Sequence, residues 1–345
     1  MLRIAQSFIG KAAAFVLATV ALAAVPVAVG PIANAEPLKI GYCDWPTWTL
    51  VDVGLEKGWF EEAGVEVELI YSDYVGTLDL FAAGQLDGVF TTQGDALVLG
   101  ATADTPSTCI LITDYSNGND MLIARPGIDS IKELKGKKVA VEVGFVNHLL
   151  ALTALKSVGM SEDDVEIVNM PTPEMPGALA SGDVDAIAAW QPATGTTLEN
   201  VGGSKALFTS ADAPGIIYDS LYVRRDSLAT RRDDWKKFVK VWFRIIDYIN
   251  ESPENREEAV RIGAARTNVE PEQFRPLLDG AYILSIDENL ETFKKGDDLS
   301  SMWGSSKFQE QFNLQYKVYA EPEFSPRYLD PSIVKEIKAE REGGM

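Results

Sequence analysis

Short β-branched runs alternate with helical stretches along the first half of the chain. The pattern predicts strands at 38–42, 65–71, 88–92, 108–113, 121–124, 138–143, 165–170 and 185–190. Helical spacing of apolar residues predicts helices at 51–62, 76–83, 95–101, 146–158 and 173–180. Strands that alternate with helices indicate βαβ units, so we expect α/β lobes with mostly parallel sheets flanked by helices.

The second half has a different pattern. A strand predicted at 216–224 returns the chain to the first lobe, and residues 226 to about 312 are expected to be largely helical. Residues 235–250 are amphipathic, and helices at 254–265 and 272–282 follow Pro253 and Pro271, a residue favoured at a helix start. The tail after Glu321 carries three prolines and then a short charged helix at 333–341, which we expect on the surface.

An internal repeat relates two parts of the first half at an offset of 98 residues. The segment AGQLDGVFTTQ at 83–93 matches SGDVDAIAAWQ at 181–191, with glycine, aspartate and glutamine in register. The period is far too long for a solenoid, so it predicts two similar lobes with a cleft between them. We expect lobe 1 to comprise 37–124 and about 222–330, lobe 2 to comprise 125–221, and the tail to comprise 331–345. Asp87 and Asp185 are interpreted as structural turn residues.

The first 35 residues have the pattern of an export signal. Arg3 and Lys11 precede and border an uncharged apolar run at 12–25, and Ala33-Asn34-Ala35 is a small-x-small cleavage pattern. Because 14 apolar residues are fewer than the roughly 20 that span a bilayer, we predict cleavage after Ala35 and a periplasmic protein.

Composition excludes several classes of function. The chain has 345 residues, 46% hydrophobic, enough for a sizeable core, and 31 basic against 51 acidic residues give a formal charge of −20. Scattered basic residues under that charge argue against nucleic acid or an anionic membrane as partner. Cys43, Cys109 and His148 are too few, and too irregularly spaced, for a zinc site, and no cofactor is expected. We also expect no disulfide, because the two cysteines fall at opposite edges of the predicted sheet.

Several phrases resemble periplasmic substrate-binding proteins of the nitrate, sulfonate and taurine ABC importer family. They are KIGY at 39–42, GLEKGWFEEAGVEVE at 54–68, the repeated GQLD and GDVD phrases, and LKGKKVAV at 134–141. DYSNGND at 114–120 is similar to a branch associated with urea-carboxylase genes. The resemblance implies a two-lobed periplasmic-binding-protein fold of type II, a monomer, and one solute delivered to an inner-membrane permease and its ATPase.

Ligand sites in open α/β sheets lie beyond the carboxyl ends of the strands, and the candidate residues all fall in or beside such strand-exit loops. They are Asp44, Trp45, Trp48, Asp73, Tyr74, Gln93, Asp95, Asn119, Asp120, Phe145, Asn147, His148, Trp190, Gln191 and Asp219. Some have structural alternatives: Asp95 as a helix N-cap, Trp190 as core, and His148 as a packing residue.

The candidates include carboxylates and aromatic rings but no lysine or arginine, which is the environment a small cation prefers. We therefore expect a guanidine-, amine- or urea-like solute captured by hinge closure near 124–127 and 218–224. A taurine, sulfonate or nitrate site is the alternative, because amides at the helix start at 144–147 suit an anion.

The same fold resembles pyrimidine-forming enzymes of thiamine biosynthesis, but this chain lacks their cysteine cluster and has a single histidine, so we expect no enzyme.

Overall fold

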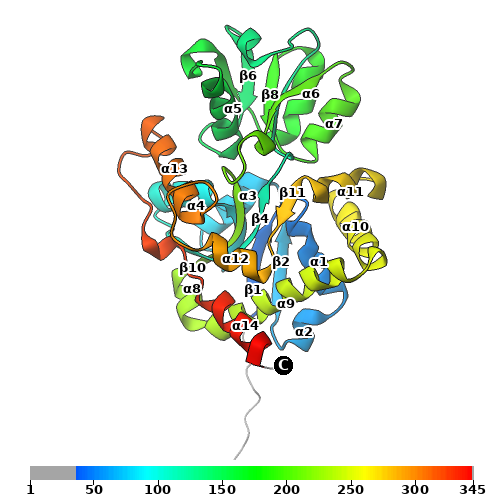
Figure 1. The fold of residues 1–345 in the computed structure, drawn as a ribbon, viewed down its shortest axis with the longest axis vertical. Coiled ribbons are helices and arrows are strands. Elements are labelled where there is room, and N and C mark those ends of the chain that lie inside the picture. The colour runs from blue at the N-terminus through cyan, green and yellow to red at the C-terminus, as the bar shows by residue number, and fades with distance from the viewer. Residues whose placement is uncertain (1–35, 344–345) are drawn as a thin grey trace, which may run out of the picture. The chain divides into compact units, whose positions relative to one another are not determined.

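The computed structural model describes residues 36–343, which fold around two β-sheets (Figure 1). The predicted export signal at 1–35 lies outside the described residues. The first sheet contains β1 (Leu38–Tyr42), β2 (Val67–Tyr71), β3 (Gly88–Thr92), β4 (Ser107–Ser116), β10 (Tyr218–Arg224) and β11 (Ala281–Ile283), in the order β11-β4-β10-β3-β1-β2. The second contains β5 (Met121–Ala124), β6 (Lys138–Val141), β7 (Glu166–Asn169), β8 (Ala186–Ala189) and β9 (Lys205–Thr209), in the order β7-β6-β8-β5-β9.

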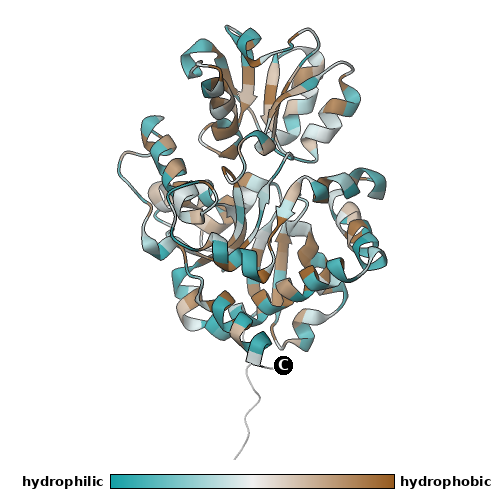
Figure 2. Ribbon diagram, in the orientation of Figure 1, coloured by the Kyte–Doolittle hydropathy of each residue, from teal (hydrophilic) through white to brown (hydrophobic). Residues whose placement is uncertain are grey.

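Helices cover the faces of both sheets. Those of the first half are α1 (Val51–Glu56), α2 (Trp59–Glu62), α3 (Tyr74–Ala82), α4 (Gln93–Ala103), α5 (Val146–Ser157), α6 (Met175–Ser181) and α7 (Ala193–Asn200). Those of the second half are α8 (Arg225–Thr230), α9 (Arg232–Glu251), α10 (Pro253–Thr267), α11 (Pro271–Asp279), α12 (Ile286–Thr292), α13 (Met302–Gln315) and α14 (Ser332–Gly343). Apolar residues gather on the strands and the inner helix faces, whereas the outer faces of α9–α11 are polar (Figure 2).

The two sheets share one topology, which confirms the α/β class and the repeat. In the first, β1–β4 run in one direction and β10 lies antiparallel between β3 and β4; in the second, β6–β9 run together and β5 lies antiparallel between β8 and β9. Asp87 Oδ2 accepts the Lys39 N–H at 2.9 Å, and Asp185 Oδ2 accepts the Lys138 N–H at 3.0 Å. The repeated aspartates therefore tie β1 to β3 in the first sheet and β6 to β8 in the second.

Removing either aspartate carboxylate is expected to destabilise the protein. Asp87→Ala and Asp185→Ala each leave a strand N–H without its charged acceptor, so we expect the free energy of unfolding to fall by about 1–3 kcal/mol in chemical denaturation. The matched control is Asp183→Ala, an exposed aspartate whose carboxylate bonds only the Ser181 hydroxyl; its effect should stay under about 0.5 kcal/mol. Equal effects in all three variants would contradict the structural role.

The crossing between the sheets differs from the predicted boundary. β5 pairs only with β8 and β9 of the second sheet, although residues up to 124 were assigned to lobe 1, and all of β10 pairs within the first. The chain crosses at 117–120 and again at 210–217. These two segments are joined by Ser116 Oγ to Ser210 Oγ at 2.7 Å and by the Ser210 N–H donating to the Asp120 carbonyl at 2.9 Å. A hinge at 218–224 is excluded, because that strand is hydrogen-bonded on both sides.

Tertiary contacts changed several local predictions. The helix expected at 51–62 breaks into α1 and α2 at Gly58, whose φ of 68° is left-handed. The helix expected at 272–282 ends at Asp279, and 281–283 form β11 on the free edge of β4. β9 and α7 were not predicted, whereas α12 and most of α13 fall within the stretch to about residue 312 that was expected to be largely helical. The tail is not a separate surface segment: Ile333, Val334 and Ile337 of α14 are fully buried, and Leu329 bridges to Cys109 of β4.

No helix among residues 36–343 is long and apolar enough to cross a membrane. Both cysteines in this range are buried free thiols.

Candidate functional site

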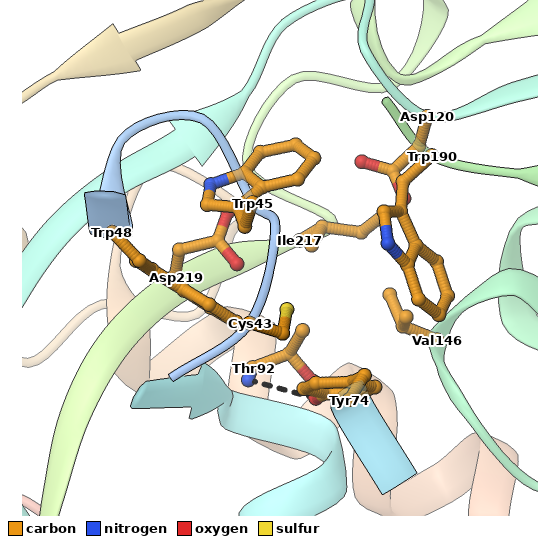
Figure 3. Close-up of a pocket in the computed structure, with 10 residues that line it drawn as sticks. All are labelled: Cys43, Trp45, Trp48, Tyr74, Thr92, Asp120, Val146, Trp190, Ile217 and Asp219. Carbon is orange, nitrogen blue, oxygen red and sulfur yellow. Dashed lines mark hydrogen bonds between the residues drawn. The ribbon is translucent and has the colours of Figure 1, made fainter. Parts of the chain in front are cut away.

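A pocket lined by buried residues lies where the carboxyl ends of the strands of both sheets meet (Figure 3). Its empty volume, with adjoining open solvent included, is about 260 Å³. Its lining residues come from both sheets and from the crossing segments; they are Cys43, Trp45, Trp48, Tyr74, Thr92, Asp120, Val146, Trp190, Ile217 and Asp219. Every one of them is less than 9% exposed. We call this space the inner pocket.

Aromatic rings form the walls of the inner pocket. Trp45 and Trp48 lie on the loop that joins β1 to α1, with ring centroids 6.3 Å apart. Trp48 lies 5.9 Å from Tyr74 at the start of α3, and Tyr74 lies 5.4 Å from Trp190, which follows β8 of the second sheet. Trp45 and Trp190 lie on opposite sides of the space (Figure 3). The faces of these rings carry partial negative charge, which attracts cations.

Two carboxyl groups face each other on neighbouring strands beneath Trp45. Asp114 of β4 and Asp219 of β10 are register partners in an antiparallel pair, where like charges directly opposite are unfavourable. Asp114 accepts bonds from Trp45 Nε1 at 3.0 Å and Thr47 Oγ1 at 2.6 Å, which favour its ionised form, although burial raises its pKa to about 6. Burial and the Asp114 charge raise the pKa of Asp219 well above its usual value. Asp219 Oδ2 has no hydrogen-bond partner.

A third carboxyl group enters from the crossing segment. Asp120 lies between β4 and β5, is 2% exposed, and its Oδ2 has no hydrogen-bond partner. Burial raises its pKa to about 7. Asp120 therefore lines the pocket from one of the segments that link the two sheets.

A fourth buried carboxyl group supports the wall from behind. The Tyr74 hydroxyl donates to Asp95 Oδ2 at 2.6 Å, and burial raises the pKa of Asp95 to about 7. The N-cap of α4 is Thr92, whose Oγ1 accepts the Asp95 N–H, so the expectation of Asp95 as the N-cap is wrong. Asp95 positions Tyr74 and does not itself line the pocket.

A larger open space, the outer chamber, adjoins the inner pocket and shares Tyr74 and Trp190 with it. It contains about 1740 Å³ of empty space. Asp44, Asp73 and Phe145 line it together with Glu142, which the sequence analysis did not single out. Burial raises the pKa of both Asp44 and Glu142. Among the described residues, no lysine, arginine or histidine lines either space.

The structure gives six predicted site residues other contacts, outside both spaces; they are Gln93, Asp95, Asn119, Asn147, His148 and Gln191. The amide of Gln93 bonds the backbone at Ile216 and Tyr218. Asn119 donates to the Leu277 carbonyl, and the Gln191 side chain accepts the Gly195 N–H.

The last two of these predicted site residues, Asn147 and His148, lie in the first turn of α5. Asn147 Oδ1 accepts the Glu142 N–H at 3.0 Å and so shapes the loop that carries this carboxyl group. His148 accepts the Gly144 N–H and packs against Phe312 of α13 and Tyr316 just after it, where burial lowers its pKa to about 4.

Sequence reasoning missed Asp114, which supports Trp45 in the wall of the inner pocket, and Glu142, which lines only the outer chamber. Asp114 lies inside a strand. Only the tertiary structure shows that it opposes Asp219 of β10 and accepts a hydrogen bond from Trp45. A signal for Glu142 existed: it follows β6 as Cys43 and Asp44 follow β1, at equivalent ends of the repeated strands. No three of the His, Cys, Asp and Glu side chains within 36–343 are arranged to hold a metal ion.

Comparisons with known proteins agree with this architecture. A putative binding protein of Brucella abortus (strain 2308) is 29% identical over 275 residues, covering 78% of this chain and 79% of the relative. The taurine-binding periplasmic protein of Escherichia coli (strain K12) is 26% identical over 171 residues, covering 49% of each chain.

The crystal structure of the periplasmic aliphatic sulphonate binding protein from Escherichia coli matches with a TM-score of 0.67 at 18% identity, covering 84% of this chain and 95% of that chain. This likeness confirms the expected periplasmic-binding-protein fold. The model of a protein family described as NMT1/THI5 like matches residues 45–256, more than half of the chain. The chain therefore belongs to the NMT1/THI5-like family.

Proposed function

We propose that this protein is the periplasmic solute-binding component of an ABC importer, and that its inner pocket takes a small nitrogenous cation of the guanidinium or amine type. In this proposal the exported chain is cleaved after Ala35, closes around one solute as a monomer, and delivers it to a permease and its ATPase. The importer role rests on the family and on the periplasmic names of its relatives. The nature of the solute rests on the pocket.

One observation carries the choice of solute. Asp120 and Asp219 each present a buried carboxyl oxygen without a protein partner, inside aromatic walls and with no basic side chain in the lining. A buried carboxylate without a counter-charge is unfavourable, whereas a cation that donates hydrogen bonds to both carboxylates satisfies it. An anion such as taurine's sulfonate is repelled by these groups in their ionised form. The small volume favours a solute of few non-hydrogen atoms.

Urea is the second candidate for the same pocket. Trp48 Nε1 is a buried hydrogen-bond donor without an acceptor. Guanidinium has no acceptor atom to offer it, whereas urea has a carbonyl oxygen that can accept this bond. Protonated carboxyl groups at Asp120 and Asp219 could pair with a neutral solute. A thermal-shift screen that includes both guanidinium and urea separates the two solutes.

The lining of the pocket supports hinge closure. All lining residues are buried and come from both lobes, so movement of Trp190 of lobe 2 away from Tyr74 of lobe 1 would open the pocket to a solute. The crossing segments at 117–120 and 210–217 are the connections available for this movement.

Catalysis is a weaker reading of the same residues. Cys43 lines the pocket, but burial raises the pKa of its thiol well above the usual value, and the thiolate is the reactive form. His148 packs against α13 instead of lining the pocket, so it is not placed to take the thiol proton.

A thermal-shift screen of the mature chain tests the proposal. The panel contains guanidinium, methylammonium, urea, taurine, methanesulfonate and nitrate, each at several concentrations. A ligand that binds only the folded state stabilises it by about 2.7 kcal/mol at one hundred times its Kd, so guanidinium or methylammonium is expected to raise the melting temperature by several degrees. A rise with urea alone assigns the neutral solute. A rise with the sulfonates or nitrate alone rejects the cation pocket.

A further inference from the structure

The outer chamber contains a second acidic group of residues that the inner pocket does not use. Asp44 and Asp73 reach it from lobe 1, and Glu142 reaches it from lobe 2. The repulsion among these three carboxylates contributes to the raised pKa of both Asp44 and Glu142. Like charges from opposite lobes line a common space, so closure of the empty protein brings them together at an electrostatic cost.

Glu142 is the clearest sign that this space accommodates a ligand. Its side chain is held in place, because Oε1 accepts the Thr172 N–H at 2.8 Å and its own N–H donates to Asn147. The residue is 6% exposed, and Oε2 has no partner although it is buried. A fixed, buried acceptor at the chamber wall is suited to a donor that arrives with the ligand.

The chamber also has an apolar surface between its acidic groups. Tyr71 and Val143 are two of the few large hydrophobic side chains that are exposed among residues 36–343, and both line it. Phe145 and Trp190 add aromatic faces. Arg266 lies over the ring of Tyr71 at 5.6 Å, but its guanidinium is bound by both oxygens of Asp52. The acidic groups of the chamber therefore have no counter-ion in the described protein.

We propose that the ligand is a dication: one cationic group in the inner pocket between Asp120 and Asp219, an aliphatic spacer over Tyr71 and Val143, and a second ammonium bound by Glu142. This inference rests on the proposed function for its first cationic group. Tyr74 and Trp190, which both spaces share, flank the spacer where it passes from one to the other. The second charge offsets the repulsion between Glu142 and the lobe 1 carboxylates and so favours closure.

Isothermal titration calorimetry with simple amines tests the second subsite. The probes are guanidinium, n-alkylamines, and α,ω-diaminoalkanes of two to six carbons. We expect an optimum chain length at which the diamine binds at least about tenfold more tightly than the alkylamine with the same number of carbons. In Glu142→Gln, which keeps the acceptor for Thr172, this advantage should fall below about threefold while guanidinium binding changes less than about twofold. Glu166→Gln, an exposed glutamate of the same lobe, is the control and should leave both unchanged.

The outcomes separate this inference from the proposed function. If guanidinium and alkylamines bind but no diamine is favoured, the second subsite is rejected and the cation pocket stands. If Glu142→Gln weakens the binding of guanidinium and of diamines equally, Glu142 acts through the overall electrostatic field of the protein or through its fold. The dication proposal is then rejected as well. If no cation binds at all, both proposals fail.

Discussion

Asp120→Asn is expected to weaken guanidinium binding by at least about thirtyfold, which corresponds to about 2 kcal/mol. The variant keeps the shape of the side chain and removes its charge. In the wild-type pocket Asp120 Oδ2 is buried without a partner, so it provides a charge-assisted acceptor that the amide does not replace. Titration calorimetry on both proteins measures the ratio of the two dissociation constants, and the melting temperature of each checks that both are folded.

The control for this variant is Asp79→Asn. Asp79 is an exposed residue of α3 and lines neither the inner pocket nor the outer chamber, so the same loss of charge should change affinity less than about twofold. If Asp79→Asn and Asp120→Asn weaken binding equally, the long-range field of the acidic protein dominates. If Asp120→Asn binds guanidinium as tightly as the wild type, Asp120 is not a ligand-binding residue.

Guanidinium affinity is expected to rise by at least about tenfold between pH 6 and pH 8. Burial raises the pKa of Asp120 to about 7, so in the empty pocket this carboxyl is mostly protonated at pH 6 and mostly ionised at pH 8. A cation binds the ionised form, and guanidinium keeps its charge over this range. Burial also raises the pKa of Asp219, which adds to the same trend. Binding therefore displaces protons, in the direction opposite to that expected for an anion.

Calorimetry in two buffers of different ionisation enthalpy measures the displaced protons directly. At pH 7 we expect about half a proton or more released per guanidinium bound. Asp114 and Asp95 titrate nearby, with pKa values raised to about 6 and about 7, but neither lines the pocket, so their contribution should be smaller. In Asp120→Asn the tenfold rise in guanidinium affinity between pH 6 and pH 8 should disappear. Proton uptake on binding, or an affinity independent of pH, would contradict a charge-based pocket.

Local patterns predicted most of the first half of the fold correctly. β1, β3 and β5 have the predicted bounds, because each is a short apolar run bounded by turn residues. The repeat predicted two similar sheets, and the matched bonds of Asp87 and Asp185 account for it physically. The elements that sequence reasoning missed or misassigned depend on distant partners: β11 is a strand only because β4 offers it a free edge.

The candidate site was likewise predicted in part from local sequence pattern and determined in part by tertiary contacts. Strand-exit position identified Trp45, Trp48, Tyr74 and Trp190, since the carboxyl ends of the strands converge in this fold. The same rule also selected Gln93 and His148, whose side chains bind backbone groups elsewhere, because residue type and loop position do not fix the direction of a side chain.

The sequence by itself determined the α/β class, the internal duplication and the acidic, aromatic character of the strand exits, because these follow from local periodicity and residue type. Only the tertiary structure decided which carboxyl groups meet. Asp114 and Asp219 are 105 positions apart and oppose each other through strand register. Glu142 comes to face Asp44 and Asp73 because the chain crosses between the sheets twice. The burial that raises the pKa of Asp120 likewise depends on both lobes, and no local pattern contains it.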